Sequence, residues 1–264
     1  MNSRVRFSTA GLRHSLHPGH YIFAAVLAVR VVALTRLSSS TFLLPAHGDM
    51  HFYDQWAQHI WHGQLTEHAA FYGLPLYAYF LALLYKLFGY GPFLPGLLQA
   101  AADGGTAVLL YQIATRVFGS DEVGKPHSRF IANHRGQLIG FAAAFAWAFF
   151  VPAQAYTVIL MPTSFAVYVF WLLVWLVVRL DSAPTARQCL FVGALIGFSA
   201  MAVATILFLV PLVLAALVLK RKIDNRSRVQ SIAAGTALLL IGIIMGASPC
   251  WIHNYLIARD PVFL

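Results

Sequence analysis

Asp49 is the residue whose chemistry the sequence presents most clearly, because its carboxylate stands in a polar stretch between two long apolar segments. One hypothesis is a general base that takes a proton from an acceptor hydroxyl, since partial desolvation at a membrane surface makes a carboxylate more basic. The alternative is a helix N-cap that satisfies free backbone N–H groups. The two roles are compatible, because a helix N-terminus also holds a carboxylate in place.

Two histidines flank Asp49 and add a second chemistry. His47, Asp49 and His51 alternate along the chain, and all three side-chain types can ligate a divalent metal. Three polar residues at alternate positions are not a specific pattern. A divalent metal therefore stays the weaker alternative, and no cofactor is expected with certainty.

The segment 51–62 has the period of an amphipathic helix. One face is apolar, and we expect its aromatic rings to lie toward lipid: Phe52, Tyr53, Trp56, Ala57, Ile60 and Trp61. The other face is polar, and we expect it to lie toward water: Asp54, Gln55, Gln58, His59 and His62. A helix of this kind lies in a membrane interface, which places Asp49 at a membrane surface.

The composition excludes a soluble globular domain. The 264 residues are 59% hydrophobic and 10% charged, whereas soluble domains carry about 25% charged residues. No barrel-like alternation is visible, so an all-α integral membrane protein satisfies the backbone best. The net charge of +9 comes from basic residues in loops between apolar spans, which indicates membrane topology and not nucleic-acid binding.

We expect about seven transmembrane helices in a single unit, residues 1–264. The predicted spans are 20–37, 93–117, 138–151, 164–180, 189–202, 206–219 and 232–247. A large first outer loop, residues 38–92, holds the interfacial helix and a second apolar helix between Pro75 and Gly89. That helix has about 14 residues and is too short to cross upright. Pro at its start and Gly after its end are typical of helix boundaries.

The basic residues decide the orientation. If the short helix does not cross and the N-terminus is cytoplasmic, all but four of the 18 Lys and Arg residues fall on the cytoplasmic side, as the positive-inside rule prefers. The outer loop, a short turn at 152–162, a kink near Ala204 and the C-terminal segment then share the outer face. We expect an uncleaved first span and a multi-pass protein of a bacterial inner membrane.

Two charged residues, Arg30 and Asp103, fall inside predicted spans. Intramembrane charges are functional candidates by default. The structural alternative is an ion pair that joins two helices, with Gln99 as a hydrogen-bond partner of Asp103, or a snorkelling Arg30. If the pair is functional, it indicates a transporter or flippase, although no internal repeat is visible.

The order of these features resembles the GT-C fold of membrane glycosyltransferases that use polyprenyl-phosphate sugars. That group includes protein O-mannosyltransferases, aminoarabinose transferases acting on lipid A, and lipid A core galacturonosyltransferases. The resemblance covers nearly the whole chain and is carried by Asp49 with Tyr53, Trp56 and Ala57, by PLYAYFLALLYKLFG at 75–89, by Gln99 with LLYQIATRVFG at 109–119, and by PCWIHNYLIARDPVF at 249–263. The segment 75–89 is its most specific part.

The resemblance implies an inverting glycosyl transfer on the outer face. Asp49 would be the catalytic base on a hydroxyl of a glycan, lipid or protein acceptor, and the lipid phosphate would leave. The substrate-binding side chains implied are Tyr53, Arg36, Lys86, His253 and Arg259. The implied partners are the lipid-linked sugar donor, the acceptor and membrane lipids.

The chain departs from the family pattern where positive charge should meet the leaving phosphate. Members often carry Arg-Pro where this chain has Val203 and Ala204. They often carry Arg-Asn-Tyr where this chain has His253, Asn254 and Tyr255. A Glu or Lys is also absent near 161–162. Members usually continue further, so we expect the C-terminal part of the family to be missing. These departures motivate the alternative of a non-catalytic or degenerate GT-C-like subunit that works with a partner.

Overall fold

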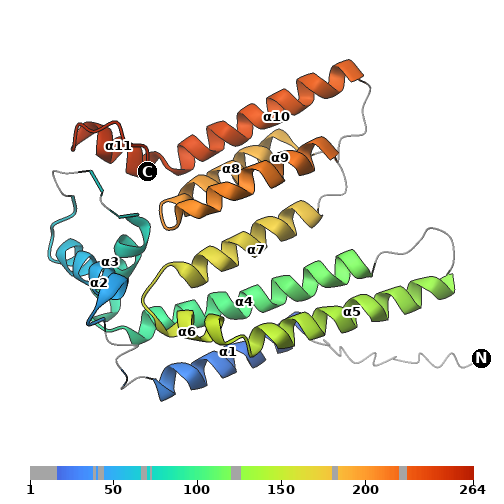
Figure 1. The fold of residues 1–264 in the computed structure, drawn as a ribbon, viewed down its shortest axis with the longest axis horizontal. Coiled ribbons are helices and arrows are strands. Elements are labelled where there is room, and N and C mark those ends of the chain that lie inside the picture. Colours follow the sequence, from blue (N-terminus) through green and yellow to red (C-terminus); the bar gives the residue numbers. More distant parts are fainter. Residues whose placement is uncertain are drawn as a thin grey trace, which may run out of the picture.

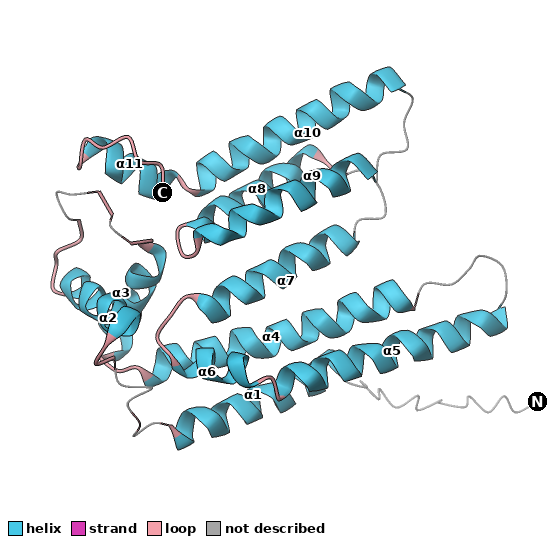
Figure 2. Cartoon of the chain, viewed as in Figure 1, coloured by secondary structure: helices cyan, strands magenta, loops and turns pink. Residues whose placement is uncertain are grey.

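The computed structural model describes residues 17–37, 40, 45–66, 70–71, 73–119, 126–179, 184–219 and 225–264. Every regular element within these ranges is helical, as the composition predicted. Figure 1 shows long helices lying side by side, with short helices gathered at one end of the molecule. Most of the described loops lie at that same end (Figure 2).

The long helices alternate in direction along the chain (Figure 1). They are α1 (Pro18–Arg36), α4 (Phe93–Phe118), α5 (Pro126–Ala148), α7 (Thr163–Arg179), α8 (Ala186–Ala200) and α10 (Asn225–Gly246), and the ten-residue α9 (Val210–Leu219) lies among them. Helix α4 packs against α1, α5 and α7, while α8 packs most closely against α10. The short helices at one end are α2 (Gly48–Trp61), α3 (Leu76–Phe88) and α11 (Ser248–Leu256).

Two of the described helices, α1 and α4, are long and apolar enough to cross a membrane alone. The number rises to four if each of two bent helix pairs is one span. These pairs are the end of α5 with α6 (Val151–Val158), bent by 53°, and the end of α10 with α11, bent by 58°. The remaining apolar helices are shorter. A membrane-associated helical protein is therefore supported, whereas the expected number of about seven spans is not confirmed.

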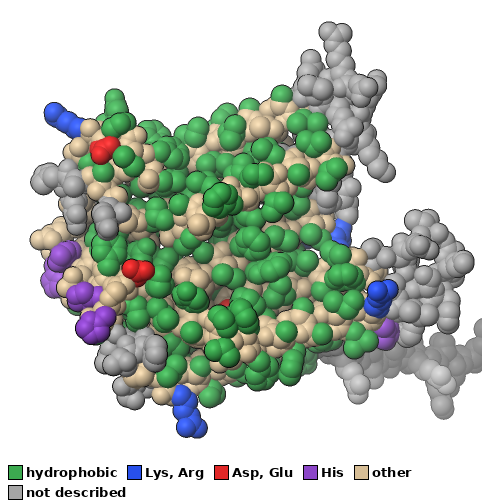
Figure 3. Space-filling view, viewed as in Figure 1, with side chains coloured by type: hydrophobic (Ala, Val, Ile, Leu, Met, Phe, Trp, Pro, Cys, Tyr) green, Lys and Arg blue, Asp and Glu red, His purple; other side chains and the backbone are tan. Residues whose placement is uncertain are grey.

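The surface agrees with an apolar environment around the middle of the helices. Hydrophobic side chains cover most of the face in Figure 3, and most charged and histidine side chains lie toward its two ends. Large apolar side chains such as Phe145 and Phe208 are 67% and 81% exposed. Contiguous apolar surface on this scale marks an interaction with a membrane or a partner.

Several predicted boundaries are confirmed. Helix α3 begins after Pro75 and ends before Gly89, whose φ of 87° is the left-handed conformation that glycine adopts most easily. The kink expected near Ala204 is the 3-10 segment η1 (Ala204–Leu209), which leads directly into α9. The turn expected at 152–162 is wrong, because most of that segment forms α6.

Four glycines let α8 and α10 approach closely. An added Cβ at Gly193 or Gly197 would lie 2.1 Å from a backbone oxygen of α10, and one at Gly242 or Gly246 would meet a backbone oxygen of α8 at 2.4 or 2.2 Å. Small residues at helix contacts are typical of membrane bundles, in which packing replaces the hydrophobic effect as the source of association.

Gly193→Ala and Gly197→Ala should each destabilise the protein, because the new methyl group meets backbone that cannot move independently. We expect a loss of about 1–3 kcal/mol, seen as a lower midpoint of thermal unfolding in detergent. Gly91→Ala is the matched control, since an added Cβ there has no atom within 4 Å. Equal midpoints for all three variants would contradict the close contact.

Candidate functional site

The apolar face of α2 packs against α3 and is not turned entirely toward lipid. Trp56, Ala57 and Ile60 are buried in one cluster with Tyr77 and Leu81 of α3. Phe52 and Trp61 keep about a third of their surface exposed, at 36% and 37%. The expectation that the whole aromatic face contacts lipid is therefore wrong, because α3 supplies a second apolar surface that covers its centre.

Asp49 lies exposed in the first turn of α2. The N-cap is His47, whose side chain makes no capping hydrogen bond, so the N-cap role expected for Asp49 is wrong. A carboxylate in the first turn still interacts favourably with the helix dipole. One turn further, burial and then the charge of Asp49 raise the pKa of Tyr53. Asp49 is therefore held on a helix with its carboxylate open to solvent.

Asp54 is buried, which contradicts the face that helical periodicity gives it. It was expected on the polar face toward water, but it is only 3% exposed. Its carboxylate accepts hydrogen bonds from the hydroxyl of Tyr85 at 2.6 Å, from that of Tyr90 at 3.1 Å and from the Gln58 amide at 2.7 Å. Asp54 thereby joins α2 to α3 and to the loop after it. The sequence held no signal for this, because both tyrosines lie more than thirty residues away.

The pKa values of the two tyrosines that bond to Asp54 reflect the same contact. Burial, and then the charge and hydrogen bond of Asp54, raise the pKa of Tyr90 to about 12. The pKa of Tyr85 is raised by burial first and by Asp54 second. Both hydroxyls therefore remain protonated donors at neutral pH, and Asp54 remains bonded in place.

Three of the expected substrate-binding cations lie at the same end of the molecule as α2. Arg36 ends α1, Lys86 lies near the end of α3, and Arg259 follows α11 with a φ of 54°. All three side chains are exposed. Tyr53 is half-buried, with its ring 5.3 Å from that of Tyr77. No described hydrogen bond or ion pair joins these four residues to Asp49.

His253 is buried and not open to solvent, at 7% exposure. Its ring stacks on Phe71, with 3.9 Å between ring centres. Asn254 Oδ1 accepts from the backbone N–H of Phe71 at 3.2 Å, and His253 Nδ1 lies 3.3 Å from the same oxygen. Because that oxygen can only accept, Nδ1 carries the proton in this contact. The other ring nitrogen, Nε2, is buried with no hydrogen-bond partner among the described atoms.

Asn254 ties the C-terminal segment to the loop before α3. The Asn254 side chain also donates to the carbonyl of Val262 at 3.2 Å, and the backbone N–H of Asp260 donates to the Asn254 carbonyl at 3.0 Å. Asn254 itself is fully buried. One side chain therefore fixes residues from α11, the C-terminal segment and the loop before α3.

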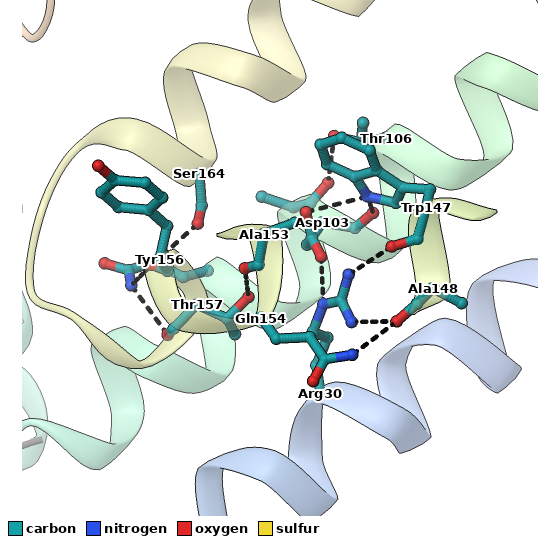
Figure 4. A network of polar contacts seen from close by, with 12 residues as sticks. Arg30, Asp103, Thr106, Trp147, Ala148, Ala153, Gln154, Tyr156, Thr157 and Ser164 are labelled. Carbon is teal, nitrogen blue, oxygen red and sulfur yellow. Dashed lines mark hydrogen bonds and ion pairs between the residues drawn. The ribbon is translucent and has the colours of Figure 1, made fainter. Parts of the chain in front are cut away.

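Arg30 and Asp103 form the ion pair that the sequence predicted as the structural alternative (Figure 4). The guanidinium also donates to the carbonyls of Ala148 at 2.5 Å and Trp147 at 2.9 Å, and the Trp147 indole donates to Asp103 Oδ1 at 3.1 Å. Arg30 is fully buried, so the snorkelling alternative is wrong. The pair holds α1, α4 and the end of α5 together at the bend before α6.

Gln99 bonds to other groups than Asp103, which corrects the sequence expectation. Its oxygen accepts from the Tyr77 hydroxyl at 2.5 Å. Its amide nitrogen lies within 3.1 Å of three carbonyl oxygens at the end of α6: Tyr156, Thr157 and Ile159. The last carbonyls of a helix lack partners within the helix, and here a side chain of α4 provides the donor.

An apolar groove of about 240 Å³ opens between the start of α7 and η1. Its lining is Thr163, Ala166, Val167, Phe170, Val203, Thr205 and Ile206. The backbone N–H at the start of α3, Leu76, donates to the carbonyl of Met201 at 3.1 Å. The groove therefore lies at the same end of the molecule as the short helices.

No metal-ligand group forms in the part of the chain that the structure describes, since no three His, Cys, Asp or Glu side chains gather there. His51 Nδ1 lies 3.0 Å from the carbonyl oxygen of Pro45, to which it can only donate, and His47 is exposed. Half of the fourteen basic residues assigned to the cytoplasmic side lie outside the described residues: Arg4, Arg6, Arg13, Lys125, Lys220, Arg221 and Lys222.

The chain matches no protein-family model, no curated protein and no solved structure.

Arg30→Met should strongly destabilise the protein, because it leaves the Asp103 charge buried without its partner. We expect a loss of about 3–5 kcal/mol in unfolding free energy, measured in detergent. The double variant Arg30→Met with Asp103→Leu is the control, and it should recover part of the loss, since neither charge remains. A double variant less stable than either single variant would contradict an ion pair.

Asp54→Asn should lower the pKa of Tyr90 from about 12 toward the ordinary value of 10.0, because the neighbouring charge is removed while burial remains. Since the folded-state pKa exceeds the unfolded one, this tyrosine's contribution to stability is complete below about pH 10 and is lost as the pH rises through about 12. Tyrosinate absorbance across pH 9–13 measures the change, and Tyr90→Phe identifies this tyrosine's share. An unchanged alkaline titration in Asp54→Asn would contradict the contact.

Proposed function

We propose that the chain is a membrane glycosyltransferase of the GT-C type, with about seven spans, that moves a sugar from a polyprenyl-phosphate donor to an acceptor hydroxyl on the outer face. The observation that carries the proposal is the exposed Asp49 in the first turn of α2, in the layer of short helices at the ends of the long helices. A general base needs both a fixed position and access to the acceptor.

The alternating helix directions support this topology. The C-terminal ends of α4, α7 and α9 lie opposite α2 and α3 (Figure 1). Several Lys and Arg residues follow α4 and α9, while Arg179 and Arg187 flank the short segment after α7. With those ends in the cytoplasm, the short helices and Asp49 lie on the outer face. Helices α7, α8 and α9 then serve as short spans. Helix tilt, local thinning of the bilayer or continuation through η1 accommodates their length.

The proposed reaction begins with Asp49 as the general base. Its carboxylate takes the proton from the acceptor hydroxyl, and the oxygen forms a bond to the anomeric carbon. The bond from that carbon to the phosphate oxygen breaks, and the lipid phosphate leaves with the electron pair, so the anomeric configuration inverts. Positive charge stabilises the leaving phosphate, and in this proposal Arg36, Lys86 and Arg259 supply it.

The groove between α7 and η1 suits the apolar part of the donor. Apart from two threonines its lining is apolar. It includes Val203, one of the two positions where the resembling family often carries Arg-Pro. An apolar side chain there favours the lipid chain over the phosphate, which moves the proposed phosphate contact to the exposed cations.

A second candidate function, a non-catalytic subunit of GT-C type, is favoured by the burial of His253. A phosphate contact needs a reachable donor, but this ring is stacked on Phe71 and only 7% exposed. In this alternative the chain keeps the scaffold and a partner subunit carries the chemistry.

Asp49→Asn tests the proposal, because it keeps the shape of the side chain and removes the base. In cells whose sugar transfer depends on this protein, we expect that transfer to fall by about 100- to 10,000-fold. Mass spectrometry of the glycans measures the change. Gln55→Ala, an exposed change on the same helix, is the control and should leave transfer intact. Unchanged glycans in Asp49→Asn, with transfer lost on deletion of the whole chain, would favour the non-catalytic subunit.

A further inference from the structure

Helix α3 is buried on one face and exposed on the other. Its buried residues are Tyr77, Ala78, Leu81, Ala82, Leu84 and Tyr85. Most of them pack against Trp56, Ala57 and Ile60 of α2. The opposite face carries Leu83 and Leu87, one turn apart, which are 55% and 63% exposed. A helix that is apolar on both faces needs an apolar neighbour on each, and α2 covers only one of them.

The exposed apolar surface continues past the end of α3. Phe88, Tyr90 and Phe93 are all exposed, and Phe93 is the first residue of α4. Only residues 89–92 separate α3 from α4, which is long and apolar enough to cross a membrane alone. Because four residues span at most about 14 Å, the exposed end of α3 lies close to the start of a candidate span, in the layer of short helices (Figure 1).

The polar groups of this surface suit the boundary between acyl chains and water. Lys86 is the only charged residue of α3, and it lies exposed beside Leu87. A lysine in this place lays its methylene groups along apolar chains and keeps its ammonium group at the level of the lipid phosphates. Tyr90 donates its hydroxyl to Asp54 while its ring stays exposed, and tyrosine is enriched at the same level of a membrane.

We propose that the exposed face of α3, marked by Leu83 and Leu87, contacts the acyl chains of the adjoining leaflet, so that α3 lies between α2 and the lipid. The lipid follows from the continuity of this face with the start of α4. The same arrangement explains why the aromatic face of α2 is mostly covered, because α3 occupies the place expected for lipid. The chemistry proposed for Asp49 makes no use of this face, so the lipid contact does not depend on the proposed function.

Site-directed spin labelling tests the contact in the full-length protein, reconstituted in phosphatidylcholine vesicles. The two native cysteines are free and buried, so the unchanged chain gives the background signal. Labels at Leu83→Cys and Leu87→Cys should show a severalfold higher ratio of collisions with oxygen to collisions with a water-soluble nickel chelate than a label at Gln55→Cys. Gln55 is the matched control, because it is exposed on the polar face of α2. Phe145→Cys, exposed on α5, gives the ratio for a label in lipid.

Two results would overturn the lipid contact. Labels at Leu83→Cys and Leu87→Cys that the nickel chelate reaches as readily as the label at Gln55→Cys would show that the face lies in water. Labels that neither reagent reaches would show that protein covers the face, either another segment of this chain or a partner. Both substitutions are at exposed positions, and an unchanged midpoint of thermal unfolding in each variant confirms that the fold is intact.

Discussion

Backbone carbonyls freed at helix breaks must find donors inside the protein, because an apolar environment offers them no water. Two side chains of this chain meet that requirement. Arg30 donates to the last carbonyls of α5 while paired with Asp103, and Gln99 donates to the last carbonyls of α6. Both Gln99 and Asp103 lie on α4, four residues apart and therefore on one face.

The short-helix layer is connected to this network. Gln99 also accepts from Tyr77 of α3, and α3 holds α2 through the bond between Tyr85 and Asp54. Helices α4 and α3, with the polar contacts between them, therefore connect the buried ion pair to the helix that carries Asp49. The bonds of Tyr77 to Gln99 and of Tyr85 to Asp54 are buried, so the loss of either leaves its partner unsatisfied.

The two carboxylates of α2 show how position decides role. Asp49 and Asp54 are both acidic residues on one helix, yet Asp49 is exposed and Asp54 is 3% exposed with three donors. Asp54 fixes the position of the helix, and Asp49 is the carboxylate left exposed on its surface.

The sequence by itself determined the helical class and most helix boundaries, because hydropathy, Pro and Gly act locally. It offered the pairing of Arg30 with Asp103 as one alternative, because an intramembrane charge requires a partner, and the structure selected that alternative. Only the tertiary structure decided three features: the break of α5 at Ala148, the formation of α6 where a turn was expected, and the partners of Gln99. The burial of Asp54 and of His253 was decided in the same way. Each depends on groups far away in the chain, such as Tyr85 for Asp54 and Phe71 for His253, and helical periodicity carries no information about which distant surface covers a given face.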